Sequence, residues 1–72
     1  MTTREALTSI LSDKAAYSKS LNYAVGYCQA ARSMSGHELV VQCIYILNNI
    51  THWRHPQAKE VRAQLKLAAK EA

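Results

Sequence analysis

The segment from Met34 to Leu39 marks a helix start in the middle of the chain and constrains the fold more than any other feature. Ser35 and Glu38 have the spacing of a capping box, and Met34 and Leu39 occupy the two positions of a hydrophobic staple around it. A helix is therefore predicted to begin at Gly36. Because so few residues separate it from the apolar segment before it, the two helices are expected to fold back as an antiparallel hairpin.

Two helices are predicted ahead of this start. Thr2 and Glu5 also have capping-box spacing, so a short first helix is expected there. Ser12 and Asp13 can cap a second helix, which is predicted to run from about Asp13 to Ser33. The apolar residues of this second helix recur at helical spacing and are expected to form a packing seam: Tyr17, Leu21, Ala24, Cys28 and Ala31.

The run from Leu39 to Ile50 is apolar around most of a helix and rich in β-branched residues. It could pass for a buried strand, but the cap before it and the lack of a second strand favour a helix. A domain of 72 residues hides only about 60% of its unfolded surface, and one hairpin cannot cover such a helix on every side. We therefore expect a homodimer or higher oligomer with this helix near its centre.

Pro56 predicts a fourth helix that starts at this residue, because proline lacks an N–H and suits the first helical position. The chain is expected to break or kink between His52 and His55. The net charge is +4, and from His52 onward five cations face two acids, so that +3 of it lies in this part. Such a positive pole suits an anionic partner. Four of these cations share one face of the fourth helix: Lys59, Arg62, Lys66 and Lys70.

The patterns together predict one all-α domain over residues 1–72: a short N-terminal helix, a hairpin and a Pro-started C-terminal helix, assembled as a homo-oligomer. Cys28 and Cys43 lie in apolar segments and are expected to be reduced core thiols. No metal site is expected, because nothing completes a ligand set around His52 and His55. We expect neither an enzyme nor a cofactor, because the chain lacks a paired nucleophile and base and a glycine-rich phosphate loop. Without a signal peptide or an apolar run of roughly 20 residues, no membrane contact and a cytoplasmic location are expected.

The pentapeptide from His52 to Pro56 holds the only Trp, the only Pro and two of the three His. An indole, a guanidinium and two imidazoles can stack on a base and pair with a phosphate. The alternative is that Trp53 closes the core, Arg54 is solvated and the histidines are surface caps. Two tyrosines one turn apart could add a stacking surface, although a core position is the alternative for them. The ligand-binding residues predicted on this basis are Trp53, Arg54, His55, Lys59, Arg62, His52, Tyr27 and Tyr23.

The run from Val41 to Lys66 resembles a segment of small helical proteins encoded by phages and prophages. Three residue pairs carry the likeness, which covers about a third of the chain: Trp53-Arg54, Ala58-Lys59 and Val61-Arg62. The resemblance implies a phage accessory protein of the kind that counters host defence. In size and helical-hairpin build the chain is also similar to phage sponges that sequester cyclic-nucleotide immune signals in oligomeric pockets. No ligand motif of those sponges can be matched residue by residue.

The leading hypothesis is a non-enzymatic oligomer in the host cytosol that captures a small phosphate-bearing nucleotide signal, with Trp53 or Tyr27 stacking on the base. The phosphate contacts are assigned to Arg54, His55, Lys59 and Arg62. Arg54→Ala and Trp53→Ala are each expected to lose the ligand and to stay folded. The alternatives are an inhibitor that binds a host protein through the third or fourth helix, and a small DNA-binding regulator. The last is less favoured, because the chain has no helix-turn-helix signature.

Overall fold

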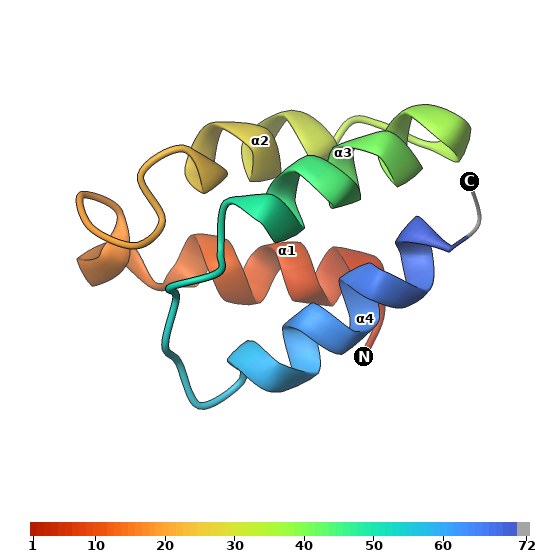
Figure 1. Ribbon diagram of the computed structural model, residues 1–72. Helices are drawn as coiled ribbons and strands as arrows, with labels where there is room; N and C mark the ends of the chain where they lie inside the picture. The colour runs from red at the N-terminus through yellow and green to blue at the C-terminus, as the bar shows by residue number, and fades with distance from the viewer. Residues whose placement is uncertain (71–72) are drawn as a thin grey trace.

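Residues 1–70, the part of the chain that the computed structural model describes, form four α-helices and no strand (Figure 1). The all-α prediction is therefore confirmed. The helices pack so that each contacts two others: α1 contacts α2 and α4, and α3 contacts the same two. A single turn of 3-10 helix, η1, follows α1. The helices are α1 (Thr3–Ser12), α2 (Ala24–Ala31), α3 (Gly36–Asn48) and α4 (Ala58–Ala69), and η1 is Lys14–Ala16.

One hydrophobic core lies between the helices, and every helix contributes to it. Its largest fully buried side chain belongs to Trp53, in the connection between α3 and α4. The Cα radius of gyration is 10.8 Å, close to the roughly 11 Å expected for a compact chain of this length. Packing within a single chain is therefore enough to enclose a core. Its other principal members are Ile10, Leu21, Cys28, Cys43, Ile46, Ile50, Val61 and Leu65.

The cap of α1 forms as its sequence predicts. The Thr2 N–H donates to Glu5 Oε1 at 2.7 Å, and the Glu5 N–H donates to Thr2 Oγ1 at 3.1 Å. Two groups that would otherwise lack partners in the first turn of α1 are thereby satisfied. Hydrogen bonds from the backbone N–H and the hydroxyl of Thr2 lower the pKa of Glu5 below its ordinary value of 4.5.

We expect the capping box to make the free energy of unfolding depend on pH in the acidic range. A carboxyl whose pKa is lower in the folded than in the unfolded chain stabilises the fold at any pH above its unfolded pKa. This contribution to the free energy of unfolding is lost as the pH falls through the folded pKa. Glu5→Gln should therefore flatten the decline in melting temperature below about pH 4.5. Circular dichroism melts across this range test it, with Glu60→Gln in the first turn of α4 as the control. Equal slopes for both variants would contradict the assignment.

The second predicted helix is wrong in its first half. Instead of a helix from Asp13 to Ser33, the chain makes η1 and a series of turns, and α2 begins only at Ala24. Other hydrogen bonds replace the helix here: the Asp13 carboxylate accepts from the distant indole of Trp53 rather than capping, and the Tyr17 hydroxyl donates to the nearby Leu11 carbonyl. The packing seam nevertheless holds, because every member after Tyr17 is buried.

α3 begins at Gly36, as predicted, but its capping box does not form. Ser35 lies at the N-cap position and its side chain makes no capping hydrogen bond. Gly36 has a φ of +60°, in the left-handed region that glycine adopts at little cost. This conformation alters the path of the first turn, so the Ser35 hydroxyl does not reach the amide that a capping box requires.

The predicted break before the last helix is confirmed, whereas the predicted start at Pro56 is wrong by two residues. Nothing between Asn48 and Ala58 is helical, and Gln57 is the N-cap of α4. Pro56 instead lies in a turn in which the Ala58 N–H donates to the His55 carbonyl at 2.9 Å. The helix begins only after this turn, because the backbone hydrogen bond of the turn takes the place of the first hydrogen bond of the helix.

α3 finds most of its apolar neighbours within the chain. Its buried side chains face α2 and α4, so the argument that only other subunits could cover this helix no longer holds. Part of α3 stays open, since Ile44 is 39% exposed and Tyr45 48%. Self-association therefore stays a prediction.

The two cysteines are free and buried, as the prediction of reduced core thiols requires. Burial, and to a lesser degree the neighbouring Cys43, raises the pKa of the Cys28 thiol to about 12. Burial also raises the pKa of the Cys43 thiol. Both groups therefore stay protonated at neutral pH and behave as small apolar side chains.

Candidate functional site

A shallow depression of about 390 Å³ lies where the connection between α3 and α4 meets the start of α4. Cationic and imidazole side chains predominate in its lining. It gathers five of the eight residues that the sequence predicted to bind a ligand: Trp53, Arg54, His55, Lys59 and Arg62. Thr51 and Ala58 complete it.

Trp53 lies beneath the depression as part of the core. Its side chain is only 1% exposed, and its Nε1–H donates to Asp13 Oδ2 at 2.8 Å. A buried indole needs an acceptor for its N–H, and Asp13, 40 residues away in the sequence, supplies it. The ring offers no open face to a base. Trp53 therefore closes the core, as the alternative prediction stated, and it is not placed to stack on a ligand base.

His55 lies against Trp53 and faces the depression. The two rings are stacked, with centroids 5.2 Å apart and an interplanar angle of 18°. His55 Nδ1 accepts a hydrogen bond from the Gln57 N–H at 3.1 Å. An accepting Nδ1 places the proton of a neutral imidazole on Nε2, which can donate to a bound anion. The stack and this hydrogen bond together fix the orientation of the ring.

Arg62 bridges the depression and the connection above it. Its guanidinium donates from Nη2 to the Ile50 carbonyl at 3.0 Å and to the Trp53 carbonyl. Both carbonyls follow the end of α3, and the Ile50 carbonyl also accepts from the Trp53 N–H at 3.1 Å. The guanidinium of Arg62 is thus a structural clamp on the connection, and Arg62 also lines the depression.

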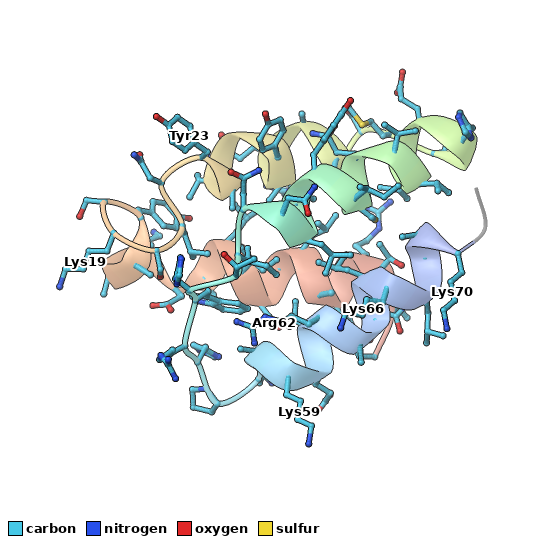
Figure 2. The ribbon with its side chains drawn as sticks, in the orientation of Figure 1. Lys19, Tyr23, Lys59, Arg62, Lys66 and Lys70 are labelled. Carbon is cyan, nitrogen blue, oxygen red and sulfur yellow. The ribbon has the colours of Figure 1, made fainter. Side chains whose placement is uncertain are left out.

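Arg54 and Lys59 are the exposed cations of the depression. Lys59 lies in the first turn of α4 and points away from the body of the protein (Figure 2). The backbone N–H groups of this first turn add positive partial charge on the same side. Glu60 lies about 100° further around the helix, so its carboxylate is directed away from Lys59.

Three of the predicted residues lie outside the depression. His52 is exposed on the connection and is not part of the lining. Tyr23 lies in the turn before α2, and Tyr27 lies on α2 itself. The ring of Tyr27 pairs with that of Tyr45 on α3 at a centroid distance of 5.8 Å. The tyrosines therefore belong to another surface, and no aromatic side chain of that surface reaches the cations.

Sequence reasoning missed Asp13, which positions the floor of the site through Trp53. The one available signal is chemical: a Trp in an apolar environment requires a hydrogen-bond acceptor, and Asp13 is an acid beside an apolar segment. Nothing local links two residues this far apart in the sequence.

Within residues 1–70 the structure contains no cluster of three or more His, Cys, Asp or Glu side chains that could hold a metal ion. No helix in this part of the chain combines the length and the apolar character needed to cross a bilayer. Comparisons with protein-family models, with curated proteins and with solved structures find no match to this chain. The likeness to phage accessory proteins therefore stays a prediction from the sequence.

Proposed function

We propose that this protein binds a small phosphate-bearing nucleotide in the depression at the start of α4, without catalysis. The observation that carries the proposal is that Arg54, His55, Lys59 and Arg62 all line one depression of about 390 Å³. Charge-assisted hydrogen bonds from a guanidinium, an ammonium and an Nε2–H are the contacts that phosphate oxygens accept. A volume of this size matches a mononucleotide-sized ligand, since ligand sites begin near 300 Å³.

In this proposal the four residues make different contacts with the ligand. Arg54 and Lys59 are exposed and able to move onto a phosphate, while Arg62 is already engaged with two carbonyls and contributes mainly a fixed charge. His55, held against Trp53, takes the stacking role that the sequence assigned to Trp53 or Tyr27. The base would lie on the outer face of the imidazole.

In biological terms the proposal follows the resemblance stated above: a phage accessory protein that sequesters a nucleotide immune signal in the host cytosol. Sequestration needs affinity and stoichiometric amounts, and no reacting group in the depression is required. In this proposal α2 and α3 form the antiparallel hairpin of a homo-oligomeric sponge, and each subunit carries its own depression.

Titration calorimetry with inorganic pyrophosphate, nucleoside diphosphates, cyclic dinucleotides and ADP-ribose tests the site. We expect Arg54→Ala and Lys59→Ala each to weaken the affinity for the best ligand at least tenfold, because each removes a charge-assisted contact of about 1.5–3 kcal/mol. The matched control is Lys66→Ala, which removes the same charge from the same helix two turns further along and outside the depression. Binding of none of these ligands, or an equal loss in all three variants, would refute the proposal.

One observation favours a second candidate, binding of a nucleic-acid backbone. Lys59, Lys66 and Lys70 are exposed and lie within about 40° of one line along α4, and the neighbouring acid, Glu60, lies about 100° away from Lys59 around the helix. Figure 2 shows the three side chains spread along this helix. A duplex or single strand bound there would lose affinity steeply with salt, and Lys66→Ala would then weaken binding as much as Lys59→Ala. The control variant of the nucleotide test thus separates the two candidates.

A further inference from the structure

Large side chains are exposed on the outer side of α2 and α3, away from the depression. Tyr23 is 73% exposed, Tyr27 38% and Tyr45 48%. We call these three residues the tyrosine face. Burying an aromatic side chain removes about 150–250 Å² from water, so leaving three tyrosines open forgoes a large stabilisation.

The tyrosine face is held rigidly from below. Gln42 is buried, with 8% of its side chain exposed, and its Nε2 donates to the Tyr27 carbonyl at 2.9 Å. This bond ties α3 to α2 directly beneath the Tyr27–Tyr45 pair. The open space above Gly26, where an added Cβ would meet no atom within 4 Å, leaves room for a partner to approach the backbone of α2. A fixed surface loses little entropy on binding.

Charge distinguishes this surface from the rest of the molecule. No Lys, Arg, Asp or Glu occurs from Ser20 to Ala31 or from Leu39 to Trp53, the segments that form α2 and almost all of α3. The net charge of +4 therefore resides on the other elements. Figure 2 shows this separation, with Tyr23 beside α2 and Lys59, Lys66 and Lys70 along α4.

This charge pattern favours a second copy of the chain as the occupant. Two copies of a chain with a charge of +4 repel each other in most orientations, but not when uncharged surfaces meet. An acidic protein or a nucleic acid would instead be drawn to α4. The principal-axis extents are 30 × 20 × 18 Å, so one whole long side measures roughly 600 Å². This is below the roughly 800 Å² per partner of a standard interface, so we expect the dimer to be weak and to depend on concentration.

We infer that the tyrosine face is a self-association surface that pairs two copies of this chain about a twofold axis. The surface differs from the one predicted from the sequence, because most of the Leu39 to Ile50 helix is buried within its own chain and only its outer side takes part. The face shares no residue with the depression. The inference rests on the homo-oligomer of the proposed function, but its test does not depend on ligand binding at the depression, so the two can fail separately.

Sedimentation velocity over a range of concentrations tests the inference. We expect the wild-type chain to form dimers, and both Tyr45→Lys and Tyr45→Glu to weaken the dimer at least tenfold. In a self-pairing face either charge meets an uncharged surface and is desolvated without a partner, whatever its sign. A charged foreign partner would respond in opposite directions to the two substitutions. The dimer should also strengthen as NaCl rises, because salt screens the repulsion between the cationic surfaces.

The matched controls are Leu67→Lys and Leu67→Glu, which place the same charges at another exposed apolar residue, on α4 and 59% exposed. These should leave the dimer unchanged. If Tyr45→Lys does not fold, Tyr23→Lys replaces it, because that side chain is 73% exposed and cannot be needed by the core. A chain that is monomeric at every concentration, or a dimer lost equally in the Leu67 variants, would overturn the inference.

Discussion

Trp53→Ala should leave the chain unfolded or nearly so at 25 °C. Truncating a buried Trp to Ala costs about 3–5 kcal/mol, and a domain this small has a free energy of unfolding near the lower end of about 5–15 kcal/mol. The substitution removes the largest buried side chain and leaves the half-buried Asp13 carboxylate without its donor. Urea unfolding followed by far-ultraviolet circular dichroism measures the loss. This outcome replaces the expectation from the sequence that Trp53→Ala stays folded.

A second substitution isolates the indole N–H of Trp53. Trp53→Phe keeps an aromatic ring but cannot donate to Asp13, so we expect a smaller cost of about 1–3 kcal/mol for the missing hydrogen bond and the reduced ring. Asp13→Asn keeps an acceptor oxygen and should cost less again. If Trp53→Ala proved to be within about 1 kcal/mol of the wild type, Trp53 would not close the core and its assignment as a binding residue would return.

Arg62→Met should destabilise the fold by about 1–3 kcal/mol, among the largest effects that we expect after Trp53→Ala. Methionine keeps the apolar stem but removes the donor to the carbonyls of Ile50 and Trp53. The Ile50 carbonyl still accepts from the Trp53 N–H, so the Trp53 carbonyl is the acceptor that loses its partner, at a cost of about 1–3 kcal/mol where water reaches it poorly. Chemical unfolding measures the change in free energy. Lys66→Met, which loses the same charge from an exposed position of α4, should change it by less than about 0.5 kcal/mol.

The Arg62 result also bears on the binding site. If Arg62→Met is no more destabilising than Lys66→Met, the guanidinium does not clamp the connection and is instead available to a ligand. If Arg62 does clamp the connection between α3 and α4, a loss of ligand binding in Arg62→Met has two causes: the displaced connection and the missing charge. Arg54 and Lys59 are for this reason the better residues for testing the nucleotide proposal.

The sequence predicts those parts of the fold that are determined locally. The cap at Thr2, the start of α3 at Gly36 and the break before α4 each depend on residues within a few positions of one another, and all three are present. The failure at Asp13 to Tyr23 has the opposite cause. Apolar spacing there fits a helix, but the carboxylate of Asp13 bonds to the indole of Trp53, 40 residues further on. Tertiary partners of this kind leave no mark in local sequence.

The candidate site was predicted in part for the same reason. Concentrating cations near a helix start in the sequence also concentrates them in space, so Arg54, His55 and Lys59 do line one depression. Composition does not show which member of such a group is buried. Trp53 lies in the core, while Tyr27 lies next to Tyr45 on a different surface. Burial depends on packing between helices, which neighbouring residues alone do not determine.

The pairwise packing of the helices closes into a ring, in which α1 contacts α2, α2 contacts α3, α3 contacts α4 and α4 contacts α1. No helix can leave this ring without breaking two interfaces, even at the ends of the chain. Local opening of a single helix should therefore cost nearly as much as global unfolding. Slowly exchanging amides in all four helices would then exchange through the same cooperative event, so the whole chain would behave as one foldon.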